Sequence, residues 1–138
     1  SKGGGISVTS LHEGCLVTGC TIVDNAADLG SAVRIYGNTV LNLERCIVAF
    51  NREGAAFSED LTGGLAMGCS DVFGHAQGDN FPSDFTDNGG NFALDPLFCD
   101  LESGTLQADS PCAAGNHPDG QDCGVVGALP VACDKLSR

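Results

Sequence analysis

The chain has 138 residues, enough for one ordinary domain. The 20 Gly, 13 Asp and 8 Asn make up 41 of these residues, while Lys, Glu, Gln and Met are scarce, so the composition excludes a helix bundle or a coiled coil. The net charge of −12 disfavours nucleic acid as a partner, and no stretch is apolar and long enough for a membrane span.

A repeat of about 25 residues runs through the first half of the chain. Three six-residue runs align without gaps, and each joins strand-forming residues to a turn former: Cys20-Thr-Ile-Val-Asp-Asn25, Cys46-Ile-Val-Ala-Phe-Asn51 and Cys69-Ser-Asp-Val-Phe-Gly74. A second set precedes them with the same period: Gly5-Ile6-Ser7-Val8, Ala32-Val33-Arg34-Ile35 and Ala56-Phe57-Ser58-Glu59. Two columns that share one period indicate a stack of similar coils.

This period has two main structural solutions, a leucine-rich horseshoe and a right-handed parallel β-helix. The dense leucine ladder of a horseshoe is missing from the sequence. We therefore predict an all-β fold, a right-handed parallel β-helix (solenoid) of about three coils with a disulfide-rich C-terminal cap. Like residues of successive coils would stack at the spacing between strands, with one inward column of Ile6, Val33 and Phe57 and another of Cys20, Cys46 and Cys69.

Asn25 and Asn51 fall at the same position of successive coils. An asparagine there can take a left-handed turn conformation, and its amide can bond to the asparagine of the next coil. We predict a buried asparagine ladder that ends at Gly74. The functional alternative for these residues is sugar binding, and the stacked cysteines are expected to be core residues or an inter-coil disulfide.

The repeat resembles the right-handed β-helix repeats of secreted bacterial proteins, the pectate-lyase-like superfamily, over residues 4–74. Later segments look like the closing segment of such chains: Asp95-Pro-Leu-Phe-Cys-Asp100, Ser110-Pro-Cys112 and Cys123-Gly-Val-Val-Gly-Ala128. We expect coils over residues 1–74. Residues 75–138 are expected to form a long acidic loop and a disulfide-stapled capping region that covers the open end of the core.

The sequence begins in mid-repeat, which predicts either a fragment or an N-terminal face that stacks on a partner. Residues 3–10 would then form an adhesive edge through which the chain self-associates. Residues 75–91 read as a long polar loop, in which calcium is the cofactor worth testing, with Asp79, Asp84 and Asp87 as oxygen ligands. Solvated turn residues are the alternative, because the spacing matches no known calcium loop.

The eight cysteines form an even set without a Cys-x-x-Cys pair, which favours disulfides and a secreted or cell-surface protein in an oxidising environment. We expect staples among the four later cysteines, Cys99, Cys112, Cys123 and Cys133. Of the 105 pairings that eight cysteines allow, we predict one that joins Cys112 to Cys123 and Cys99 to Cys133.

The lyases that the repeat resembles use one exposed sheet, on which carboxylates hold calcium and an Arg or Lys takes a proton. Strand alternation and that resemblance make four residues candidates for such a site: Arg34, Tyr36, Glu59 and Asp60. These carboxylates are too few for a typical lyase, and solubility explains them equally well.

We therefore expect a non-catalytic structural or binding module of a secreted or cell-surface β-helix protein. It would contact glycan, extracellular matrix or itself by end-to-end stacking, without nucleic acid or a membrane span. The alternative is a polysaccharide lyase or hydrolase of the pectate-lyase-like superfamily.

Overall fold

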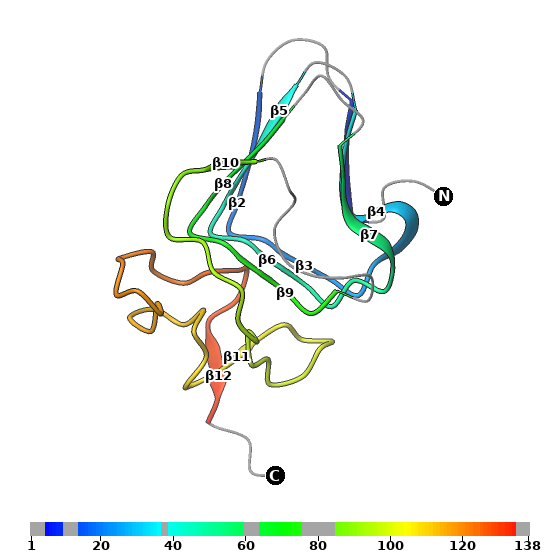
Figure 1. The fold of residues 1–138 in the computed structure, drawn as a ribbon. Coiled ribbons are helices and arrows are strands. Elements are labelled where there is room, and N and C mark those ends of the chain that lie inside the picture. The colour runs from blue at the N-terminus through cyan, green and yellow to red at the C-terminus, as the bar shows by residue number, and fades with distance from the viewer. Residues whose placement is uncertain (1–4, 10–13, 37–38, 60–63, 76–84, 135–138) are drawn as a thin grey trace.

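The computed structural model describes residues 5–9, 14–36, 39–59, 64–75 and 85–134. They form an all-β structure in which parallel strands stack as a solenoid of about four turns, as the repeat predicts. The coils wrap around one core on three sides (Figure 1). The right-handed sense of the coil stays a prediction. No helix in the described ranges is long and apolar enough to cross a membrane.

Three parallel sheets form the walls of the solenoid. The first contains β1 (Ile6–Thr9), β4 (Ala26–Tyr36) and β7 (Glu53–Glu59). The second contains β2 (Cys15–Thr18), β5 (Val40–Glu44), β8 (Gly64–Gly68) and β10 (Thr86–Asp87). The third contains β3 (Thr21–Val23), β6 (Ile47–Ala49) and β9 (Asp71–Phe73).

The register confirms the first inward column. Ile6 pairs with Val33, and Val33 pairs with Phe57. Because alternate residues of a strand point to opposite faces, one face of each sheet lines the core. The buried residues of this core are Ile22, Ala32, Val33, Ile35, Leu41, Leu43, Cys46, Val48, Ala56, Leu65, Met67 and Val72.

The cysteine column is correct for Cys20 and Cys46 and wrong for Cys69. Ile47 pairs with Asp71, a step of 24 residues, so the position equivalent to Cys46 belongs to Ser70. The Cys46 N–H accordingly donates to Ser70 Oγ at 3.2 Å. Cys69 lies one residue earlier with a left-handed φ of 49°, and forms a disulfide with Cys123. Aligning the three cysteines by identity therefore hid a shift of one residue.

Parallel pairing continues beyond residue 74, where we expected the coils to end. β10 pairs with β8, and Phe92 forms a parallel bridge with Asp71. Phe85 packs against the core at this turn. Gly, Asp and Asn crowd residues 86–91, which explains why no strand pattern is visible there in the sequence.

The region that follows, residues 93–134, packs against the outer face of the third sheet (Figure 1). We expected it to cover the open end of the core. That coverage stays a prediction. The structure shows that apolar side chains of this region join Ile47 and Ala49 in a second buried cluster, which contains Phe92, Phe98, Leu106, Cys112, Cys123 and Val126. β6 is consequently buried on both faces. Such strands read as continuous apolar runs, which is how the sequence Ile47-Val-Ala-Phe50 reads.

Regular structure is sparse in this C-terminal region. β11 (Leu106–Gln107) pairs in parallel with β12 (Val131–Cys133), and turns make up most of the remainder. The disulfide between Cys99 and Cys133 confirms one expected pairing. The other expected pairing is wrong, because Cys123 bonds to Cys69 of the solenoid and Cys112 is a buried free thiol. Cys69 is available for this bond because the register shift places it at a corner of the coil.

Candidate functional site

Two corners of the coil flank the third sheet, and each contains a column of residues with positive φ. The column before β3, β6 and β9 consists of Gly19, Arg45, Cys69 and Gly90, and the column after them of Asp24, Phe50 and Gly74. The left-handed residue thus lies one position before the asparagine of the predicted ladder. Non-glycine residues rarely take this conformation, so the repeat of the same turn in every coil holds them there.

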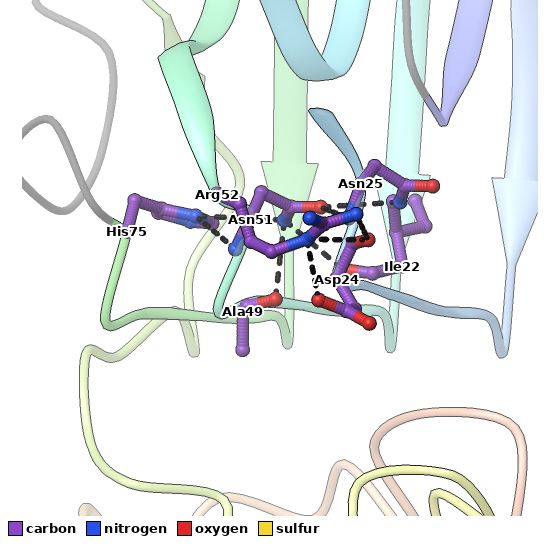
Figure 2. A network of polar contacts seen from close by, with 7 residues as sticks. All are labelled: Ile22, Asp24, Asn25, Ala49, Asn51, Arg52 and His75. Carbon is purple, nitrogen blue, oxygen red and sulfur yellow. Dashed lines mark hydrogen bonds and ion pairs between the residues drawn. The ribbon is translucent and has the colours of Figure 1, made fainter. Parts of the chain in front are cut away.

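The second corner contains the predicted ladder (Figure 2). Asn51 Oδ1 accepts hydrogen bonds from the Asn25 backbone N–H at 3.0 Å and from Asn25 Nδ2 at 3.1 Å. Asn51 Nδ2 donates to the carbonyl oxygens of Ile22 and Ala49. Asn51 is 1% exposed, so these bonds satisfy a buried amide and tie three segments of the coil together.

The third position of the ladder belongs to His75, and the expected end at Gly74 is wrong. The Asn51 backbone N–H donates to His75 Nδ1 at 3.3 Å, so the imidazole takes the place of an asparagine oxygen. Gly74 belongs to the left-handed column, where an added Cβ would approach the Phe50 ring to 2.7 Å. Beside the ladder, the exposed Arg52 and Asp24 form an ion pair of 2.7 Å (Figure 2).

The free thiols of Cys20 and Cys46, at the corner before the third sheet, belong to the core. Burial raises the pKa of Cys46 to about 11, although backbone hydrogen bonds at Cys20, Glu44 and Gly19 act against the shift. The thiol itself donates to the carbonyl oxygens of Val17 and Glu44. The thiol therefore stays protonated, which is the form that a core residue takes and a metal ligand does not. Cys20 Sγ repeats the same pattern with the Thr18 carbonyl at 3.5 Å.

Of the four lyase candidates, the structure describes the side chain of Arg34, so their assembly into one site stays a prediction. Arg34 is half-buried in β4, where it pairs with Ser7 and Ser58. The backbone of Tyr36 pairs with Thr9, and the backbone of Glu59 pairs with Ile35. The Tyr36 and Glu59 side chains and all of Asp60 lie outside what the structure describes.

Of the three calcium candidates, the structure describes Asp87, while Asp79 and Asp84 lie outside the described residues. Asp87 Oδ1 accepts hydrogen bonds from the Gly89 N–H and from Asn91 Nδ2, so it stabilises a turn. Within residues 85–134 and the other described segments, no three His, Cys, Asp or Glu side chains are arranged to hold a metal ion.

A pocket of about 370 Å³ lies where the C-terminal region meets the second corner, and we call it the seam pocket. Its lining residues are Phe50, Asp95, Leu97, Phe98, Cys99, Asp100, Leu101 and Gln107. The Phe50 and Phe98 rings pack edge to face, with centroids 6.2 Å apart. The disulfide of Cys99 and the hydrogen bond from Gln107 Nε2 to the Phe98 carbonyl oxygen brace this wall.

A buried carboxyl group contacts the chain just before the segment that lines the pocket. Asp71, on the outer face of β9, is fully buried, and it accepts hydrogen bonds from the Leu94 N–H at 3.0 Å and from Cys112 Sγ at 3.2 Å. Burial, with a smaller contribution from the nearby charge of Asp95, raises the pKa of Asp71 to about 7 against the two hydrogen bonds. Burial and the Asp71 charge also raise the pKa of the Cys112 thiol.

The sequence alone does not reveal the seam pocket. The segment Asp95-Pro-Leu-Phe-Cys-Asp100 resembles a closing segment, although its two aspartates flank a run of apolar residues, a pattern that can line a pocket. Within the repeat, Phe50 is the residue that points to this pocket. It occupies the turn position that Asp24 occupies in the previous coil. An aromatic side chain at an exposed turn is unusual enough to suggest a contact beyond the coil.

Comparison with family models, with curated proteins and with solved structures found no match to this chain. The described structure thus establishes a parallel β-solenoid, while membership of the pectate-lyase-like superfamily has no support beyond the resemblance of the repeat.

Chemically, the seam pocket combines aromatic and aliphatic surface with two carboxylates at exposed positions. Pockets of this composition bind small ligands by apolar contact and use a few polar groups for orientation. Asp95 and Asp100 are each held by a local turn, since their Oδ1 atoms accept the N–H groups of Leu97 and Ser103. Such fixed carboxylates can accept hydrogen bonds from hydroxyl groups or pair with a cation.

Proposed function

We propose that this chain is a non-catalytic binding module of a secreted or cell-surface β-solenoid protein, and that it contacts a glycan at the seam pocket. The observation that carries the proposal is the pairing of aromatic surface with fixed carboxylates in one open pocket. Sugar rings present apolar C–H faces and hydroxyl donors, and Phe50 with Asp95 and Asp100 complements both.

The location outside the cell rests on the disulfides. Both bonds involve the C-terminal region, and disulfides persist in oxidising compartments. We also propose that the repeat is related to the repeats of the pectate-lyase-like superfamily. Contact with extracellular matrix or with a second copy through residues 3–10 stays a prediction, and calcium belongs in the same binding experiments as an added component.

The test is a titration of the 15N-labelled chain with neutral, acidic and amino-sugar oligosaccharides, followed by amide chemical shifts. We expect saturable shifts confined to residues 95–101, Phe50 and Gln107, and reduced shifts in a Leu101→Ala variant. Leu101 is a suitable target because it lines the pocket and is 41% exposed, so its truncation leaves the buried clusters intact.

Leu129→Ala is the matched control, because Leu129 is 40% exposed and lies outside the pocket lining. Shifts that remain unchanged in Leu101→Ala, or that are absent with all three oligosaccharide classes, would overturn the proposal.

The alternative function, a polysaccharide lyase or hydrolase, is tested with the same ligands. A lyase would release unsaturated uronate products from acidic polysaccharides, which absorb in the ultraviolet, and a hydrolase would release reducing ends. Product formation that is lost in an Arg34→Ala variant would replace the binding proposal by the enzymatic one. Arg34 was chosen because it is the one lyase candidate whose side chain the structure describes.

A further inference from the structure

The seam pocket has a strongly one-sided charge environment. Two of its lining residues are aspartates, and none is basic. The sequence contains no Lys or Arg between Arg52 and Lys135, so the whole described C-terminal region lacks a permanent cation of its own. At the neighbouring corner of the solenoid, Arg52 is paired with Asp24.

One of the pocket carboxylates is also close to a further acidic group. Asp95 interacts electrostatically with the buried Asp71, which is partly charged at neutral pH because its pKa is raised to about 7. An anionic ligand at this position would add to the repulsion, and a neutral ligand would leave it unchanged. A cation at Asp95 and Asp100 would relieve it, because opposite charges at close range favour the charged form of both groups.

The apolar part of the pocket restricts the shape of such a cation. Phe50, Phe98 and Leu101 offer surface that a fully hydrated metal ion would leave unused. A ligand with a ring of C–H groups, hydroxyl donors and one ammonium group would use the apolar surface and both carboxylates. Aromatic rings near the ammonium group would add a modest cation–π attraction.

We infer that the seam pocket binds a glycan built from amino sugars with free ammonium groups. This inference rests on the proposed glycan-binding function and narrows it to a cationic ligand. Asp95 and Asp100 pair with the ammonium group, while Phe50 and Leu101 contact the sugar ring. The opposite preference, for acidic uronates, would belong to a lyase of the superfamily that the repeat resembles.

The experiment compares three oligosaccharides of equal length by calorimetric titration of the full chain. They are an oligomer of glucosamine, its fully N-acetylated counterpart and an oligogalacturonate. We expect the glucosamine oligomer to bind at least about tenfold more tightly than the acetylated one, with an affinity that falls as salt is added. The oligogalacturonate is expected not to bind.

Two double variants separate pairing in the pocket from general attraction to an acidic protein. Asp95→Asn with Asp100→Asn keeps both local turns, because an asparagine oxygen can still accept the turn N–H, and it should abolish the preference for the glucosamine oligomer. Asp119→Asn with Asp122→Asn removes the same charge from exposed positions outside the pocket lining, and it should leave the preference intact.

The outcomes distinguish the two proposals. Equal binding of the glucosamine and acetylated oligomers would overturn the cationic preference and keep the glycan-binding function. No binding of any oligosaccharide would overturn both. An equal loss in the two double variants, or tighter binding of a lysine tetrapeptide than of the glucosamine oligomer, would overturn the assignment of the pocket to an amino sugar.

Discussion

The solenoid and the C-terminal region are stabilised in different ways. In the solenoid, each coil pairs with the next along three sheets, and ladders such as Asn25, Asn51 and His75 repeat the same contacts from coil to coil. The C-terminal region has one short parallel pair of its own, β11 with β12, and two disulfides. A repeat distributes its stability over many equivalent contacts, whereas the other region depends on a few specific ones.

The attachment between the two regions is correspondingly localised. Ile47 and Ala49 supply the apolar surface of the solenoid, and the Gly127 N–H donates to the Arg45 carbonyl oxygen at 2.7 Å. Gly127 approaches so closely that an added Cβ would lie 2.6 Å from Ile47 Cδ1. We therefore expect the seam, the contact between the third sheet and residues 93–134, to be sensitive to substitutions at these few positions.

Removing the disulfide across the seam should have the largest effect. The double variant Cys69→Ser with Cys123→Ser opens a loop that spans a sequence separation of 54 residues. By the loop-entropy relation, this lowers the free energy of unfolding by about 4 kcal/mol. We expect the amides of Val126 and Gly127 to exchange much faster with solvent, while those of Ile47 and Val48 stay protected.

The control is Cys99→Ser with Cys133→Ser, which removes a bond of similar entropy, with a separation of 34 residues, from inside the C-terminal region. That variant should loosen β11 and β12 and leave the seam amides less affected. Equal exchange patterns in the two variants would show that the regions unfold as one unit.

The asparagine ladder allows the same kind of test in the solenoid. Asn51→Ala leaves the carbonyl oxygens of Ile22 and Ala49 and the Asn25 amide without their partners, and should cost about 3 kcal/mol in chemical denaturation. Asn42→Ala is the control, because Asn42 makes one long hydrogen bond, of 3.4 Å, to the Cys15 carbonyl oxygen. A loss in Asn51→Ala no greater than in Asn42→Ala would contradict the role of the ladder.

The sequence predicts the solenoid well because its physical cause is periodic. Inward apolar residues and the Asn25 and Asn51 pair recur at one spacing, and each recurrence supports the others. The prediction failed where the coil changes length. Cys69 and Gly74 resemble Cys46 and a turn former in type, yet the structural equivalents are Ser70 and His75. Residue identity cannot reveal that the left-handed position lies one residue before the ladder.

The seam could not be predicted in the same way, because nothing in it repeats. Its contacts join residues far apart in the sequence, such as Asp71 and Cys112, which are 41 positions apart, and Ala128 and Thr21, which are 107 positions apart. Each depends on the fold of both regions, and an aspartate in β9 looks like an ordinary surface residue until the opposing chain covers it. The apolar run of β6 was the available sign that the third sheet is covered on its outer face.

The smallest of the three effects is a pH dependence of the seam. Because the pKa of Asp71 is raised to about 7 in the folded chain from an ordinary value of 3.8, the folded state binds the proton more tightly. The stability from this group is therefore complete below about pH 4 and is lost as pH rises toward 7, by about 2 kcal/mol between pH 5 and pH 7. Asp71→Asn should flatten this slope in denaturation curves, whereas Asp119→Asn, at an exposed position, should keep it.

If Asp71→Asn kept the full slope, another group would cause the pH dependence. The carboxyl group of Asp71 would then be charged at neutral pH without a loss of stability. A flattened slope in Asp71→Asn, together with slower amide exchange above pH 7 in the C-terminal region alone, would show that the Asp71 charge weakens the seam without affecting the coils.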